Sequence, residues 1–245
     1  MEIQQKIREI AARIFPEILA IRRHIHEHPE LSFEEFETAA FICKTLDKWG
    51  VTYKSGIAGN GIVAEIEGSK PGRTIAFRAD MDALPVTEIN NLSFKSVNTG
   101  KMHACGHDVH TASLLGAVRI LLDLRDTLKG KVKFVFQPAE ERIPGGASLM
   151  LKEKLFSPEE PEIIIAQHVF PDMETGNVGF RSGLYMASSD EIYITVKGKG
   201  GHAALPDRVI DPVLITAHLI TSLQQIVSRN AKPGLPTVLS FGKVE

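Results

Sequence analysis

The densest group of reactive side chains in this sequence lies between residues 102 and 110. One thiol and three imidazoles fall within these nine positions, in a chain that contains only two cysteines and nine histidines. Cys105 and His107 are two residues apart, so in an extended segment their side chains leave the same side of the backbone and can bind one cation. Thiolate and imidazole together favour a borderline-soft ion such as zinc. A buried thiol beside helix-capping histidines is the alternative that these residues alone leave open.

Two apolar segments downstream end in further ligand-type side chains. Residues 131–137 have the pattern of a buried strand, and the adjacent carboxylates Glu140 and Glu141 follow it. One such carboxylate can bind a metal while its neighbour accepts a proton from a metal-bound water, as a metallohydrolase requires. The isoleucine-rich residues 162–168 predict another buried strand that ends at His168. A solvated acidic turn and a satisfied core histidine are the alternatives for these positions.

A third strand, predicted for residues 73–79, is followed by Asp80 and Asp82. In open α/β sheets the ligand crevice lies outside the carboxyl ends of the strands, where all of these segments place their polar side chains. Metal-bound histidines usually donate their second N–H to an acceptor, and Asp80 and Asp82 are suited to that task. Acids in a surface turn are the alternative. The pattern therefore predicts one metal centre at one edge of a sheet.

Apolar periodicity predicts the elements that position these side chains. Up to about residue 182, apolar strands alternate with amphipathic helices, which is typical of a layered α/β sheet with flanking helices. From residue 190 onward, the strands have one polar face. Asp108 is the expected N-cap of its helix. The expected strands lie at 61–67, 73–79, 131–137, 162–168, 189–197 and 237–243, and the expected helices at 2–26, 33–49, 107–126, 144–153 and 209–229.

Five segments, in order along the chain, resemble the signatures of the M20 peptidase group. Within that group the likeness is strongest to the branch of hippurate hydrolases and N-acyl-amino-acid amidohydrolases, and it runs from about residue 10 to the last residue. The resemblance implies an α/β catalytic domain with a layered mixed sheet at residues 1–183. The first half of a ferredoxin-like α+β lid domain is expected at residues 184–245. The five segments are residues 22–31, 78–85, 103–108, 137–141 and 198–204.

The resemblance also implies a site with two divalent metal ions, for which zinc, manganese, cobalt and nickel are the candidates. Cys105 matches the ligand that bridges the two ions, and Glu140 matches the general base. His202 matches an oxyanion donor that reaches the substrate carbonyl, in some relatives from the neighbouring subunit. The residues that match metal ligands are Cys105, His107, Glu141 and His168.

Similar proteins continue past the position of Glu245, where this sequence stops. It stops before one more histidine ligand and before the basic residue that is expected to hold the substrate carboxylate. We therefore expect either a fragment of a longer enzyme or a truncated and inactive product. Asp207 stands where relatives often carry histidine, so contacts within the lid are expected to differ locally.

Length and composition fit an enzyme rather than a nucleic-acid or membrane protein. With 245 residues, 43% of them hydrophobic, the chain can bury a sizeable core. The net charge of -2 provides no attraction for nucleic acid or anionic membranes, and no apolar stretch is long enough to span a bilayer. The first residues lack the apolar region of a signal peptide, and two cysteines do not suggest a disulfide framework. A cytoplasmic protein is therefore expected.

The expected activity is hydrolysis of the amide bond of an N-acyl amino acid by metal-activated water. Hippurate-like and N-acetyl compounds are the expected small-molecule substrates, and the lid domain is expected to form a homodimer. A dipeptidase or carboxypeptidase of the same group is the alternative within the family. A non-catalytic binding or dimerisation fragment is the alternative from another class of protein.

Overall fold

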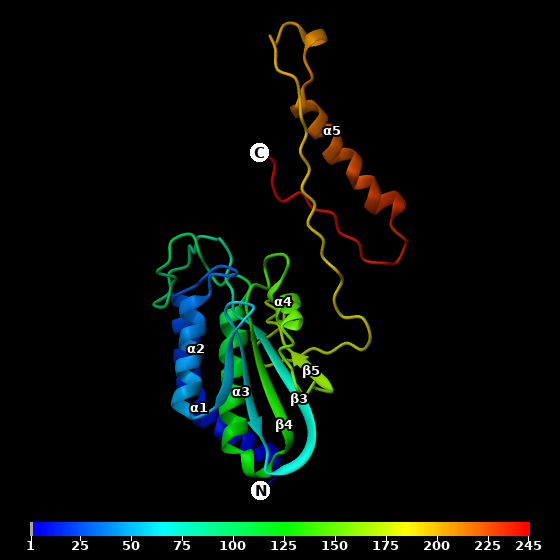
Figure 1. The fold of residues 1–245 in the computed structure, drawn as a ribbon. Helices are drawn as coiled ribbons and strands as arrows, with labels where there is room; N and C mark the ends of the chain where they lie inside the picture. Colours follow the sequence, from blue (N-terminus) through cyan, green and yellow to red (C-terminus); the bar gives the residue numbers. More distant parts are fainter. Residues whose placement is uncertain (1) are drawn as a thin grey trace. The chain divides into compact units, whose positions relative to one another are not determined.

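A five-stranded mixed sheet forms the centre of the N-terminal part of the chain (Figure 1). The structure is a computed structural model that describes residues 2–245. The strand order is β1-β2-β4-β3-β5; β2 is antiparallel to β1 and β4, whereas β3 is parallel to β4 and β5. The strands are β1 (Thr52–Ile57), β2 (Gly61–Glu67), β3 (Lys70–Asp80), β4 (Lys129–Gln137) and β5 (Ile163–Ala166).

Four of these strands confirm the sequence prediction, and β1 was not expected. Its sequence contains Lys54, Ser55 and Gly56, and most of its residues are exposed. A polar edge strand of this kind has no apolar periodicity to reveal it. Its place in the sheet comes from antiparallel pairing with β2, in which Tyr53 lies opposite Ala64.

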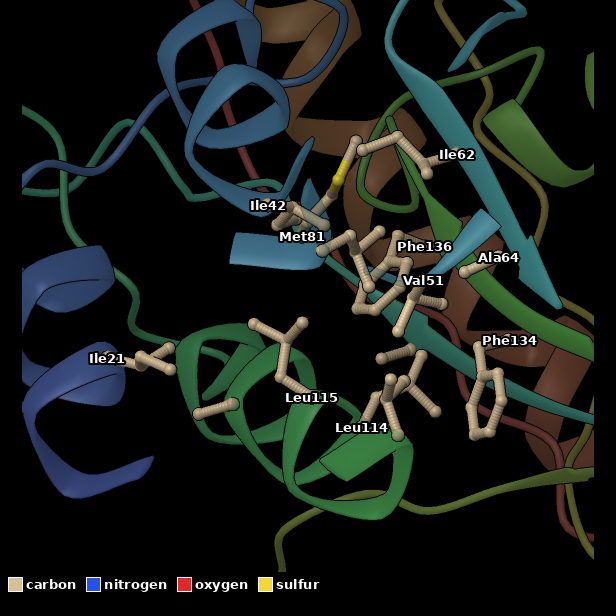
Figure 2. Close-up of a cluster of buried hydrophobic side chains, with 14 of the residues drawn as sticks. Ile21, Ile42, Val51, Ile62, Ala64, Met81, Leu114, Leu115, Phe134 and Phe136 are labelled. Atoms are coloured by element: carbon tan, nitrogen blue, oxygen red, sulfur yellow. The ribbon is translucent and has the colours of Figure 1, made fainter. Parts of the chain in front are cut away.

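Alternate residues of β2 and β4 enter the core on opposite faces of the sheet. Ile62 and Ala64 of β2 lie opposite Phe136 and Phe134 of β4, and all four are fully buried in one cluster (Figure 2). Burial on both faces explains why these strands are almost continuously apolar. The cluster on the other face contains Val63, Ala76, Val135, Met150, Leu155 and Phe156.

Three long helices cover the face of the sheet that carries Ile62 (Figure 1). Ile21, Ile42 and Leu115, one from each of these helices, belong to the same buried cluster (Figure 2). A shorter helix contributes Met150 to the cluster on the opposite face. The helices of this part are α1 (Ile3–Glu27), α2 (Phe36–Trp49), α3 (His107–Asp123) and α4 (Gly146–Lys152), with a short 3-10 turn η1 (Arg125–Thr127).

The chain divides into two compact units, residues 1–177 and 178–245. The division falls slightly before the join expected near residue 183, and the roles of the two parts stay predictions. The second unit contains η2 (Pro206–Arg208), α5 (Pro212–Gln225) and the π-helical turn η3 (Ile226–Asn230). Asp211 caps α5, because its side chain accepts the N–H groups of Val213 and Leu214. Within residues 2–245, none of the helices combines the length and apolar character needed to cross a bilayer.

The strands predicted at 189–197 and 237–243 are wrong for this structure. Neither segment pairs in a sheet, and among residues 178–245 the only bridge joins Lys199 and Ile210. Ile192 and Val238 are 75% and 85% exposed. A strand is completed by hydrogen bonds to a neighbouring strand, and alternation of side chains does not supply that neighbour. The ferredoxin-like arrangement of this part therefore stays a prediction.

Candidate metal centre

The parallel strands β3, β4 and β5 end at one edge of the sheet and present polar residues there. Asp82 follows β3, Glu140 and Glu141 follow β4, and His168 follows β5. The carboxyl ends of parallel strands are where ligand sites form in α/β sheets. Cys105 and the first residue of α3, His107, reach the same place from the loop before that helix. The structure therefore brings side chains of the four predicted segments together, and their roles as ligands and base stay predictions.

Cys105, His107 and His168 form one group of ligand atoms, which all lie within 4.8 Å of one another. The Sγ of Cys105 lies 3.3 Å from the Nε2 of His168. His168 Nδ1 donates to the carbonyl oxygen of Val169 at 2.8 Å, so Nε2 is left without a proton and faces the thiol. An imidazole held in this tautomer is ready to bind a metal through Nε2.

His107, Glu140 and Glu141 form a second group with ligand atoms within 4.8 Å. His107 is fully buried, and its Nδ1 donates to Asp82 Oδ1 at 3.2 Å. Its Nε2 lies 3.7 Å from Glu141 Oε1, and neither atom has a hydrogen-bond partner among the described residues. Buried polar atoms normally have partners. Burial lowers the pKa of His107, but the hydrogen bond to Asp82 and the charges of Asp80 and Glu141 outweigh it and raise that pKa, so the place between Nε2 and Oε1 attracts positive charge. These residues therefore fit a metal ion, which would replace the proton there.

Asp82 connects three parts of the site through its buried carboxylate. Besides contacting His107, it accepts a hydrogen bond from the Ser32 hydroxyl at 2.6 Å and one from the Glu141 backbone N–H at 2.9 Å. One side chain thus fixes both a candidate imidazole ligand and the backbone of a candidate carboxylate ligand. This is the arrangement by which outer carboxylates orient metal-binding residues.

Asp80 contacts a histidine to which the sequence reasoning assigned no role. His110 Nδ1 donates to Asp80 Oδ1 at 2.6 Å, and His110 Nε2 accepts the Val169 N–H at 3.0 Å. Asp80 also pairs with Arg78 at 2.7 Å. Together with His107, Asp80 and His110 make a third group of ligand-type atoms within 4.8 Å. The spacing of His107 and His110, three residues apart on one helix face, is the signal that could have revealed this contact.

The prediction that Asp108 caps α3 is wrong. The N-cap is Gly106, and no side chain caps this helix end. Asp108 lies in the first turn, fully buried, and binds His26 Nδ1 and Arg22 Nε, each at 2.8 Å. Gly106 has φ +86°, and a Cβ there would lie 2.4 Å from a methyl group of Val169. Glycine therefore permits both the turn and the close approach of the Cys105 loop to the end of β5.

Burial and neighbouring charges shift the acid–base behaviour of the site. Burial raises the pKa of Asp80, but the His110 hydrogen bond and the Arg78 charge outweigh it and bring that pKa down to about 2. Partial removal from water, with the negative charges of Glu141 and Asp80, raises the pKa of Glu140. Burial and the Glu141 carboxylate raise the pKa of the Cys105 thiol to about 12, so a bound cation has to displace its proton.

His202 lies in the second unit, in an exposed turn. Its Nδ1 accepts the backbone N–H of Ala204 at 3.1 Å, which leaves Nε2 as a donor. The role of His202 as an oxyanion donor stays a prediction.

Replacing His103 by phenylalanine should remove a loss of stability at acid pH. Burial holds the pKa of His103 down to about 4, against 6.5 for the unfolded side chain. Between pH 6.5 and 4 the unfolded chain binds a proton that the folded chain does not, so falling pH favours unfolding. His103 should therefore cost the parent about 3 kcal/mol of unfolding free energy between pH 7 and pH 4, a loss that the variant avoids. Denaturant unfolding of parent and variant at pH 7 and pH 4 measures it, and equal pH dependence in both proteins would contradict the prediction.

The chain belongs to the family described as Peptidase family M20/M25/M40, which matches residues 76–242. The resemblance to the M20 peptidase group is thereby confirmed. An N-acyl-L-amino acid amidohydrolase from Geobacillus stearothermophilus is 43% identical over 237 residues, which cover 97% of this chain and 64% of that relative. This chain therefore spans less than two thirds of the length of that relative.

Two solved structures share the fold. One, from methicillin-resistant Staphylococcus aureus and provisionally described as an aminohydrolase, has a TM-score of 0.80 at 38% identity. The match covers 98% of this chain and 63% of that one. The other is the Bacillus subtilis YXEP protein, described as a dinuclear metal-binding peptidase of the M20 family. Its TM-score is 0.65 at 41% identity, over 72% of this chain and 47% of that one.

Proposed function

We propose that this protein is a metal-dependent amidohydrolase that cleaves the amide bond of N-acyl amino acids, with hippurate-like or N-acetyl compounds as substrates. The observation that carries the proposal is the buried pair of His107 Nε2 and Glu141 Oε1, which face each other 3.7 Å apart without hydrogen-bond partners. Such a pair suits a cation. The 43% identity to an N-acyl-L-amino acid amidohydrolase supports the choice of substrate class.

Two divalent ions are proposed, as the description of the YXEP protein as dinuclear supports. Thiolate and imidazole ligands favour zinc, while manganese, cobalt and nickel remain candidates. When bound, such ions lower the pKa of a water ligand and polarise the substrate carbonyl. Cys105 is the proposed bridging ligand. The four proposed ligands are Cys105, His107, Glu141 and His168.

Glu140 is the proposed general base, adjacent to the ligand Glu141. Its raised pKa makes its carboxylate a better proton acceptor than an ordinary glutamate. It would take the proton from the attacking water and pass it to the nitrogen that leaves as the free amine. Asp82 holds His107 in the tautomer that leaves Nε2 free. Asp80 holds His110, and through it the Val169 backbone next to His168.

His202 is the proposed donor to the substrate carbonyl oxygen as negative charge develops on it. Residues 184–245 are proposed to form the lid, through which two copies of the chain form a homodimer. A reducing compartment, the cytoplasm, is proposed because a metal ligand at Cys105 requires a free thiol.

The test is release of free amino acid from hippurate and from N-acetyl amino acids by the metal-loaded protein expressed from its complete gene. Hydrolysis should stop after treatment with a chelator and return when zinc or manganese is added. Release that survives complete metal removal, or no release from any acyl amino acid by metal-loaded protein, would contradict the proposal.

A dipeptidase or carboxypeptidase is the second candidate, because the family is described as one of peptidases. The two activities differ in the acyl group, on the carbonyl side of the scissile amide bond. Hippurate and glycylglycine release the same C-terminal glycine; hippurate carries an uncharged benzoyl group and glycylglycine a glycyl group with a charged amine. A higher kcat/KM for hippurate supports the amidohydrolase, and a higher value for glycylglycine supports the peptidase.

A further inference from the structure

Two buried polar side chains of the segment between α1 and α2 contact neighbours of the Glu140–Glu141 pair. Ser32 and Glu35 lie in this segment and are 7% and 0% exposed. Both contact residues far away in the sequence that lie next to the proposed base and ligand.

Glu35 holds the residue that immediately precedes Glu140. Its Oε1 accepts the backbone N–H of Ala139 at 2.7 Å, and its Oε2 accepts the side-chain N–H of Asn60 at 3.1 Å. Asn60 also donates to the carbonyl oxygen of Phe33 at 3.3 Å, which ties the carboxylate to its own segment. A buried carboxylate is costly unless donors surround it, so this contact with Ala139 is a strong one.

Ala139 has a backbone conformation that needs such support. Its φ is +48°, in the left-handed region that non-glycine residues rarely adopt. Glu35 fixes its N–H, and its carbonyl oxygen accepts the Gly146 N–H at 2.8 Å. The left-handed turn sets the direction in which the chain enters Glu140 and Glu141. Relaxation of Ala139 to a negative φ would change that direction.

Ser32 acts one contact further away, through Asp82. Its hydroxyl donates to Asp82 Oδ2 at 2.6 Å, and the same oxygen accepts the Glu141 N–H at 2.9 Å. Ser32 therefore limits the rotation of the carboxylate that holds both Glu141 and His107. The Ala139 N–H thus donates to the Glu35 carboxylate, and the Glu141 N–H donates to the Asp82 carboxylate that Ser32 holds in place. Both contacts depend on the segment between α1 and α2.

We infer that Glu35 and Ser32 are positioning residues for the Glu140–Glu141 pair, acting through Ala139 and Asp82. The inference rests on the proposed function, since it concerns the base and ligand of that site. It assigns the segment before α2 a role in catalysis although neither side chain touches substrate or metal. Partners of this kind typically change metal affinity or activity by about 10- to 100-fold when removed.

The test compares Glu35→Leu with Glu88→Leu, which removes another buried carboxylate that contacts Ser96 and His26 and not residues 139–141. Metal affinity and the absorption spectrum of the cobalt-substituted protein are measured with kcat and KM. Glu35→Leu should lower kcat and cobalt affinity by about 10- to 100-fold, shift the cobalt spectrum and leave KM within about threefold. Glu88→Leu should change none of these.

Two further variants separate positioning from loss of stability. Glu35→Gln keeps an acceptor for the Ala139 N–H and should recover most of the activity. Ala139→Gly removes the Cβ that disfavours positive φ. Adding it to Glu35→Leu should therefore raise kcat and cobalt affinity about tenfold above those of Glu35→Leu alone. If Glu35→Leu does not fold, Ser32→Ala carries the test, with cobalt affinity expected to fall by about threefold or more.

Equal effects of Glu35→Leu and Glu88→Leu, no recovery by Ala139→Gly, or unchanged cobalt affinity in Ser32→Ala would overturn the inference. Failure of the proposed function is a different result. A parent protein that binds cobalt but hydrolyses no N-acyl amino acid would contradict the proposed function, and the cobalt affinities and spectra would still decide the inference. A parent that binds no cobalt would overturn both.

Discussion

Replacing Glu140 by glutamine should reduce the turnover of an N-acyl amino acid by roughly 10²- to 10⁴-fold while bound metal stays unchanged. Glutamine keeps the shape of the side chain but cannot accept a proton. Glu140 lies beside His107 and Glu141, and its raised pKa suits a base. The measurement is kcat, together with metal content of the same preparation, at saturating substrate.

The matched variant is Glu141→Gln, one residue away in the same turn. Glu141 Oε1 faces His107 Nε2 at 3.7 Å, so the loss of its charge should release metal as well as activity. Both variants should therefore lose activity, but only Glu141→Gln should also lose metal. The opposite pattern, with metal lost only from Glu140→Gln, would show that base and ligand are exchanged.

Replacing Asp82 by alanine should destabilise the protein by about 3–5 kcal/mol, the cost of breaking a buried charged pair. The carboxylate is fully buried and holds donors from Ser32, His107 and Glu141, which alanine would leave without an acceptor. Metal affinity should also fall by about 10- to 100-fold. Denaturant unfolding measures the first effect, and titration with zinc measures the second.

The control for Asp82→Ala is Asp126→Ala, which removes an exposed acid in η1. It should change the free energy of unfolding by no more than about 0.5 kcal/mol. If the two variants unfold with the same free energy, Asp82 does not hold the site together as its hydrogen bonds suggest.

The strand ends could be predicted from the sequence because the signal is local. The apolar residues 131–137 and 162–168 are buried-strand patterns, and each is followed within a few residues by carboxylates or a histidine. Parallel pairing of β3 with β4 and β5 then brings Asp82, Glu141 and His168 to one edge. Local periodicity and the general rule for α/β sheets were enough for this part of the site.

Contacts between distant residues could not be predicted in the same way. Glu35 and Ala139 are 104 positions apart, and no pattern in a single sequence joins them. Asp108 has the residue type and place of an N-cap, but tertiary contacts with His26 and Arg22 take its carboxylate instead. The alternating residues 189–197 show the limit of periodicity, because alternation describes a face and pairing needs a second strand.

The most direct test of the metal centre is metal analysis of the protein after exhaustive dialysis, compared with Cys105→Ala and His168→Ala. Cys105 Sγ and His168 Nε2 lie 3.3 Å apart and come from separate segments, so each variant removes one ligand from a different part of the fold. The parent should retain divalent metal, and each variant should bind it at least about tenfold more weakly. Unchanged stoichiometry and affinity in both variants would place the metal elsewhere.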